Sequence, residues 1–190
     1  MRLVLASASP RRFDLLARIG VIPDVVDAAE IDETPRRSEA AAAYARRMAD
    51  EKASAVALRH SGALVLAADT VVIVGRRILP KAESEEEAAS CLRQLSGRRH
   101  RVLSAVSLID GETRRRQRLS ASIVTFGVLN EHDINAYLGS GEWQGKAGGY
   151  AIQGRAEAWV RFLGGSHSGV VGLPLFETRA LLRAAGYPIG

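Results

Sequence analysis

Short apolar runs alternate with amphipathic helical patterns along this 190-residue chain, and this alternation constrains the fold more than any other feature. The apolar run Leu3 to Ala6 is followed by a helical pattern from about Pro10 to Ile19, which stops at Gly20. A longer helical pattern covers about Glu39 to Arg59, and the apolar run Ala63 to Val74 comes next. Such alternation predicts an α/β fold with a sheet flanked by helices.

The rest of the chain continues this alternation without repeats, linkers or low-complexity tracts. We therefore expect one domain that covers residues 1–190. In the first of the later helices, Ser84 and Glu87 have the spacing of a capping box. The expected elements are a helix over 84–95, paired strands over 102–109 and 119–128, and helices over 130–138 and 175–185.

Composition places the chain among cytoplasmic globular proteins. Hydrophobic residues make up 47% of the sequence, which is ample for a packed core. No apolar run approaches the ~18 residues that a membrane-spanning helix needs, so no membrane partner is expected. Cys91 is the only cysteine, which excludes an intrachain disulfide and fits a reducing compartment.

A net charge of +5 favours an anionic partner, either a nucleic acid or a small polyphosphate. The longest basic run, Arg114 to Arg116 with Arg118, follows a turn signal at Asp110-Gly111. The simplest interpretation of this run is the solvated end of a hairpin. Aromatic residues make up only 5% of the chain and none lies among these arginines, so binding of nucleic acid is not expected.

The stretch Ser7 to Arg12 is the first candidate site. Ser9 followed by Pro10 is typical of an N-cap and a first helical residue. The free N–H groups and the dipole of a helix N-terminus favour an anion, whereas Arg11 and Arg12 oppose that dipole. A bound phosphate would explain both arginines, although two solvated surface arginines are an alternative.

Lys52 is the second candidate because it lies on the apolar face of its predicted helix. It is four residues from both Met48 and Val56, and Tyr44 shares the same face. A lysine in that position either extends to the edge of the apolar surface or meets an anion in a cleft.

Asp69 is the third candidate, since it interrupts the apolar run Ala63 to Val74. Aspartate is depleted in strands and costly to bury unpaired. A carboxylate at the end of a buried strand can bind Mg²⁺ or act as a base. The alternative is a turn residue that caps a backbone N–H.

Other common site patterns fail. Gly145-Lys146 suggests a phosphate loop, but Ala147 replaces the required Ser or Thr, and no G-x-G-x-x-G motif occurs. The four histidines lack the spacing of zinc ligands.

Several of these motifs occur together in one known family. The chain resembles the Maf-like nucleotide pyrophosphatases over nearly its whole length. The matching stretches are residues 5–12 with Leu15-Leu16, Asp32-Glu33, residues 51–53, residues 68–72, residues 95–97, residues 146–154 and residues 170–175.

This resemblance implies a mixed, twisted sheet flanked by helices with a deep substrate cleft, usually in a homodimer. It also implies hydrolysis of the α–β bond of nucleoside triphosphates with a divalent cation, Mg²⁺ or Mn²⁺, as a house-cleaning step of nucleotide metabolism. Asp69 corresponds to the proton acceptor, and Glu33 with Asp69 would hold the metal. The expected phosphate-binding residues are Ser9, Arg11, Arg12, Lys52, Lys81 and Lys146.

Three positions correspond to the family's specificity residues: Arg11, Thr70 and Gln153. The glutamine motif is typical of the dTTP/UTP branch, and a sister branch that acts on 7-methyl-GTP usually lacks it. An amide carries both a donor and an acceptor, which suits a pyrimidine's carbonyl and imide groups. The chain departs from the family pattern at Ala82, where proline is usual, at Arg99, where threonine is usual, and at Gly145, where an acidic residue is frequent.

Two other functions remain alternatives at this point. A phosphate-monoester phosphatase would release orthophosphate, but nothing in the sequence resembles a phosphatase nucleophile. A basic nucleic-acid or regulatory binding module would show salt-sensitive binding that depends on Arg114 to Arg118.

Overall fold

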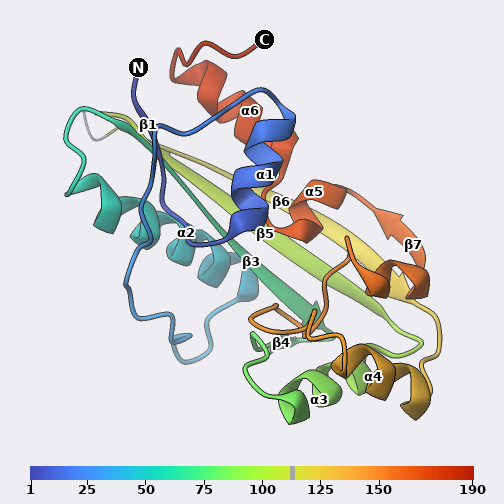
Figure 1. Ribbon diagram of the computed structural model, residues 1–190. Coiled ribbons are helices and arrows are strands. Elements are labelled where there is room, and N and C mark those ends of the chain that lie inside the picture. The colour runs from blue at the N-terminus through green and yellow to red at the C-terminus, as the bar shows by residue number, and fades with distance from the viewer. Residues whose placement is uncertain (112–113) are drawn as a thin grey trace. The chain divides into compact units, whose positions relative to one another are not determined.

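The computed structural model describes residues 1–111 and 114–190 and confirms the predicted α/β class (Figure 1). Within these residues, seven strands form one mixed sheet in the order β2-β1-β3-β5-β6-β7, and β4 pairs with β3. Strand β1 (Leu3–Leu5) runs parallel to β2 (Val25–Val26) and β3 (Leu64–Val74), whereas β4 (Arg77–Leu79) is antiparallel to β3.

The later strands and the helices follow the expected alternation. At one end of the sheet, β6 pairs with β7 in the antiparallel direction. Elements not yet given are β5 (Arg99–Ile109), β6 (Arg115–Phe126), β7 (Val160–Gly164), α1 (Pro10–Arg18), α2 (Ala41–Ala57), α3 (Glu85–Leu95), α4 (Glu131–Leu138), a 3-10 helix (Arg155–Trp159), α5 (His167–Val171) and α6 (Leu175–Ala184). No helix in the described ranges is long and apolar enough to cross a membrane.

The chain forms two compact units, and the division between them falls inside β3. The first unit comprises Met1–Asp69, Ser104–Ser120 and Gly172–Gly190. The second comprises Thr70–Leu103 and Ala121–Val171. Each unit therefore contains segments that are distant in sequence.

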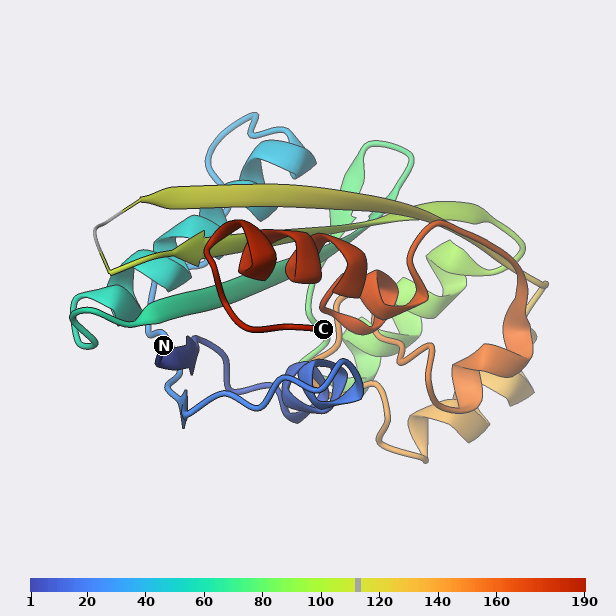
Figure 2. The ribbon, with the colours of Figure 1, turned by 90° about the horizontal axis from the view of Figure 1, so that it is seen from above.

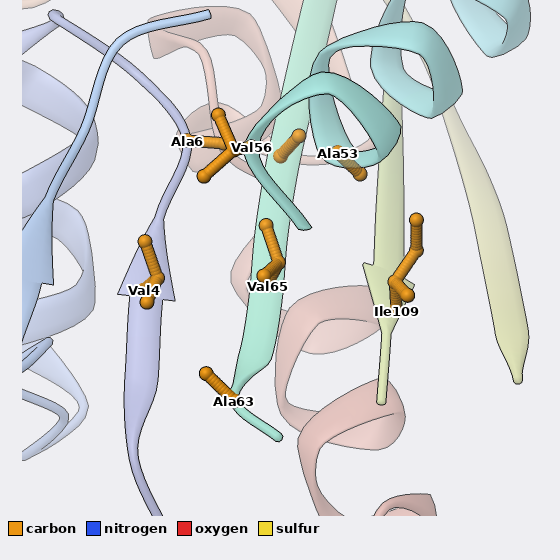
Figure 3. Packing of buried hydrophobic residues seen from close by; sticks show 8 residues of the cluster. Val4, Ala6, Ala53, Val56, Ala63, Val65 and Ile109 are labelled. Atoms are coloured by element: carbon orange, nitrogen blue, oxygen red, sulfur yellow. The ribbon is translucent and has the colours of Figure 1, made fainter. Parts of the chain in front are cut away.

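Helix α2 packs on the sheet of the first unit through small aliphatic side chains (Figure 3). Ala53 and Val56 of α2 belong to one buried cluster with Val4 of β1, Val65 of β3 and Ile109 of β5. The two views of the ribbon show α2 running beside β3 (Figures 1 and 2). Burial of such side chains stabilises the fold by about 1.5–3 kcal/mol for each valine or isoleucine. Because this contact fixes α2 against β3, it also determines where the other residues on this face of α2 lie.

Aromatic side chains form the corresponding centre of the second unit. The rings of His100, Phe126 and Tyr150 contact one another edge to face, with centroids 4.9–5.5 Å apart. Trp159 extends the cluster from Phe126 to Tyr137. The cluster joins β5 and β6 to α4 and to the loop that precedes the 3-10 helix.

The capping box predicted for α3 is only partly correct. Ser84 is the N-cap, and its side chain accepts a hydrogen bond from the backbone N–H of Glu87. The carboxylate of Glu87, however, accepts from the backbone N–H of Glu83 at 2.9 Å, so it binds one residue before the cap. A complete capping box is found instead at Asn130 and Asp133, at the start of α4.

Candidate functional site

Asp69 lies in the interior of β3, and not at the end of a strand as its sequence context predicted. The residue is only 2% exposed, and its Oδ1 accepts a hydrogen bond from Lys52 Nζ at 2.7 Å. Burial of an unpaired carboxylate is costly, whereas a hydrogen-bonded ion pair offsets much of that cost. The ammonium of Lys52 therefore explains how β3 can continue through an aspartate.

The ammonium of Lys52 also contacts the carboxylate of Glu33. Lys52 Nζ lies 2.8 Å from Glu33 Oε1, so one nitrogen connects two carboxylates. Lys52 is 6% exposed, which confirms the predicted burial of this face of α2. The side chain of Glu33 is 37% exposed, so the group is open to solvent on the Glu33 side. The sequence left two interpretations for Lys52: extension to the edge of the apolar surface, or contact with an anion. The structure shows contact with anions, and these are carboxylates of the protein itself.

Arg12 brings a second positive charge to these carboxylates. Its Nη1 donates to Ser7 Oγ at 3.0 Å, and its Nε donates to the carbonyl of Gly172 at 2.9 Å. Burial lowers the pKa of the Arg12 guanidinium, while the charges of Asp69 and Glu33 raise it. Arginine stays protonated under such conditions, so two cations and two carboxylates form a group with no net charge.

The N-terminus of α1 has the predicted form. Pro10 is the first helical residue and Ser9 is the N-cap, but within the described chain the Ser9 side chain makes no capping hydrogen bond. The first turn contains no acidic residue, and both Arg11 and Arg12 are half-buried in it. The backbone N–H groups of this turn thus keep the character of an anion-binding helix terminus.

The two carboxylates fit the expected divalent cation by their chemistry and convergence. Both place an oxygen within 2.8 Å of one nitrogen atom, so both can reach one small cation. Carboxylate oxygens are preferred ligands of Mg²⁺, which usually takes one or two of them together with water and substrate phosphate. Over the residues that the structure describes, no group of three or more His, Cys, Asp or Glu side chains could hold a metal. Glu33 and Asp69 are two residues that could hold such an ion.

In the second unit, the segments that carry Lys81 and Lys146 are paired. Lys81 forms an isolated antiparallel bridge with Ala147, and the N–H of Ala82 donates to the carbonyl of Lys146 at 3.1 Å. Lys81 is exposed, whereas Lys146 is half-buried and its Nζ donates to the carbonyl of Gln144 at 2.8 Å. Two of the predicted phosphate-binding lysines are thus neighbours in the fold.

The predicted specificity residue Gln153 lies in a loop that is fixed on both sides. The N–H of Ala151 donates to the hydroxyl of Tyr137 at 2.9 Å, and the N–H of Arg155 donates to Glu142 Oε2 at 2.8 Å. Gln153 itself is exposed. A side chain that is exposed on a fixed backbone is well suited to contact a ligand. Thr70, the third specificity residue, follows Asp69 in β3 and is half-buried.

The predicted basic run at Arg114 to Arg118 is partly neutralised. Arg115 contacts Asp50 of α2 at 2.6 Å, and Arg116 contacts Asp110 at 2.7 Å. These pairs agree with the interpretation of the run as the end of a β-hairpin, formed here by β5 and β6.

Comparisons with known proteins identify the family of the chain. A mixed sheet flanked by helices, with a helix N-terminus that carries two arginines, fits an enzyme that binds phosphate. A family model described as "Maf-like protein" matches residues 2–185, and the chain belongs to this family.

Relatives with assigned activity match almost the whole chain. A dTTP/UTP pyrophosphatase of Zymomonas mobilis is 60% identical over 98% of this chain and 93% of its own length. A dTTP/UTP pyrophosphatase of Rhodospirillum rubrum is also 60% identical, over 99% of this chain and 90% of its own. Among solved structures, a dITP/XTP pyrophosphatase of Mycobacterium abscessus is 18% identical, with a TM-score of 0.48 over 99% of this chain and 95% of that one.

Sequence reasoning did not assign the supporting contacts of four residues, of which only Ser7 lay in a candidate site. Ser7 and Gly172 anchor Arg12, and Tyr44 and Arg47 contact the segment around Glu33. Ser7 and Gly172 both lie in the stretches that carry the family resemblance, which was a usable signal. Tyr44 was predicted only as part of the apolar face of α2.

The buried histidine of the second unit gives a prediction about pH. His100 Nε2 lies 2.8 Å from the hydroxyl of Tyr150, and burial lowers the pKa of His100 to about 4, against a smaller opposing contribution from the Arg98 backbone. An unfolded histidine titrates near 6.5. Because the folded state binds the proton less readily, the stability contributed by neutral His100 is complete above about pH 6.5. It is lost as the pH falls toward 4, by up to about 3 kcal/mol.

Urea denaturation at several pH values checks this. We expect His100→Gln to remove part of the decline in unfolding free energy between pH 6.5 and 4. The exposed His132→Gln serves as the control and should decline like the unmodified protein. An unchanged decline in His100→Gln would contradict the assignment.

Proposed function

We propose that this chain is a nucleoside triphosphate pyrophosphatase that converts dTTP and UTP to the monophosphate and pyrophosphate. The observation that carries the proposal is the ammonium of Lys52 between the carboxylates of Glu33 and Asp69. These three side chains place fixed charges side by side, and enzymes of phosphoryl transfer rely on such charges to position the phosphates and to stabilise the transition state. The activity named for relatives that are 60% identical over nearly the full chain supports the reaction and the two substrates.

The roles that we propose for the protein's residues follow from their chemistry. Asp69 orients a water molecule and accepts its proton while the water oxygen attacks the α-phosphorus. The bond from that phosphorus to the bridging oxygen breaks, and pyrophosphate leaves. Lys52 and Arg12 offset the negative charge that develops on the leaving group. Gln153 selects the pyrimidine base, and the remaining predicted contacts, Ser9, Arg11, Thr70, Lys81 and Lys146, keep the roles that the family resemblance implies.

We propose that Glu33 and Asp69 hold a divalent cation, either Mg²⁺ or Mn²⁺. Their oxygens converge on one point and are of the kind that such ions prefer. When bound, the cation supplies positive charge to phosphate oxygens. We also propose that the protein acts in the cytoplasm as a homodimer. The single cysteine supports the compartment, and light scattering of the purified protein would test the dimer.

A turnover screen of the purified protein tests the reaction and its substrates. The substrates are dTTP, UTP, CTP, GTP, ATP and 7-methyl-GTP, each with Mg²⁺ and with Mn²⁺, and pyrophosphate and orthophosphate are measured separately. We expect pyrophosphate from dTTP and UTP. Pyrophosphate from 7-methyl-GTP alone would keep the reaction but contradict the pyrimidine preference. Release of orthophosphate alone, or of neither product, would contradict the proposal.

A single substitution tests the role of Asp69. Asp69→Asn keeps the size of the side chain but removes the base, so we expect turnover of dTTP to fall about 10²–10⁴-fold. Circular dichroism should show an unchanged fold. Asp50→Asn, which alters a half-exposed ion pair with Arg115, is the matched control and should stay near normal. A near-normal rate for Asp69→Asn would rule out this role.

A further inference from the structure

The backbone around Glu33 belongs to neither a helix nor a strand. Residues 27–40 connect β2 to α2 without regular secondary structure, and residues 34–38 are all exposed. The N–H of Asp27 donates to the carbonyl of Leu5 at 3.0 Å, but residues 28–40 lie outside the sheet that holds Asp69 in β3. Some other contact must therefore fix the carboxylate of Glu33 beside Lys52.

Tyr44 provides one such contact. Its hydroxyl donates to the backbone carbonyl of Glu33 at 2.8 Å, and the residue is buried. The bond fixes the peptide group of the residue whose side chain reaches Lys52.

Arg47 provides the second contact, one residue further along the segment. Its Nη2 donates to the carbonyl of Thr34 at 3.1 Å. The same guanidinium binds both carboxylate oxygens of Glu39 at 2.7 Å, and the two side chains are only 14% and 10% exposed. A two-pronged pair of this kind is geometrically specific. The guanidinium also lies 5.5 Å from the ring centre of Tyr44, so the two residues support each other.

All of these contacts originate from one helix. Tyr44, Met48 and Lys52 follow each other at intervals of four residues and share one face of α2. The helix that presents the ammonium of Lys52 therefore also holds the backbone of the carboxylate that this ammonium contacts. A general stabilising role for Tyr44 and Arg47 would not require their bonds to end on Glu33 and Thr34.

We propose that Tyr44 and Arg47 are positioning residues that hold Glu33 in its place for the reaction and for the divalent cation, an inference that rests on the proposed function. Neither residue touches the reacting atoms. Their effect passes through the backbone of Glu33, so it should disappear when the Glu33 carboxylate is absent.

A double-mutant cycle with Tyr44→Phe and Glu33→Gln tests this dependence. Tyr44→Phe removes one oxygen atom and leaves the ring, so we expect kcat/KM for dTTP to fall about five- to tenfold, as for the loss of one hydrogen bond. In the Glu33→Gln background the same change should have no further effect. Tyr187→Phe, on a tyrosine near the C-terminus, is the matched control and should leave kcat/KM unchanged. Equal losses in both backgrounds would overturn the proposal.

Binding of Mn²⁺ without turnover provides a second measurement, by electron paramagnetic resonance of the free ion. We expect Tyr44→Phe and Arg47→Lys to weaken Mn²⁺ binding severalfold, and to have no such effect in the Glu33→Gln background. Lysine keeps the charge of Arg47 but cannot make all of its hydrogen bonds. Unchanged Mn²⁺ affinity in both variants would overturn the positioning role. If the unmodified protein released no pyrophosphate while the Mn²⁺ cycle behaved as expected, the proposed reaction would fail and the positioning of Glu33 would stand.

Discussion

The ammonium of Lys52 between Asp69 and Glu33 is the interaction on which the first unit depends. Removal of one partner from a buried ion pair typically costs about 3–5 kcal/mol, because an uncompensated charge is left behind. The contact with Lys52 on α2 therefore offsets much of the cost of placing Asp69 in the interior of β3. The neighbouring Ala53 and Val56 help to hold α2 in this position, since they pack it against the sheet. Packing and charge pairing thus require the same placement of α2.

This arrangement also explains how four charged side chains can lie together in a largely buried place. Arg12 and Lys52 balance Asp69 and Glu33, and Arg12 is fixed from two distant parts of the chain, Ser7 and Gly172. The charges are in place before a substrate arrives, which is the condition for electrostatic catalysis with little reorganisation. The exposed side of Glu33 leaves access for a cation or a phosphate. Stability and the proposed chemistry therefore rely on one set of residues.

Local patterns in the sequence predicted those features that depend on neighbouring residues. Helical spacing placed Lys52 on the buried face of α2, and the Ser9-Pro10 pair marked the start of α1. The partners of these residues were not predictable in this way, because they come from other segments. The predicted position of Asp69 at the end of a strand was wrong, because the ion pair that permits it inside β3 involves a residue 17 positions away. Strand β2 was missed because two residues carry no periodic signal, and the role of Glu33 came only from the family resemblance.

Binding of Mn²⁺ to the nucleotide-free protein, compared between the unmodified chain and Lys52→Met, tests most directly whether the site is organised as described. The Lys52 ammonium contacts oxygens of both carboxylates that are proposed to hold the cation, so it competes with a metal for them. The account predicts tighter Mn²⁺ binding in Lys52→Met, and a loss of that gain when Glu33→Gln is added. Equal or weaker binding in a Lys52→Met protein with unchanged circular dichroism would contradict the assignment of Glu33 and Asp69 as the metal-binding pair.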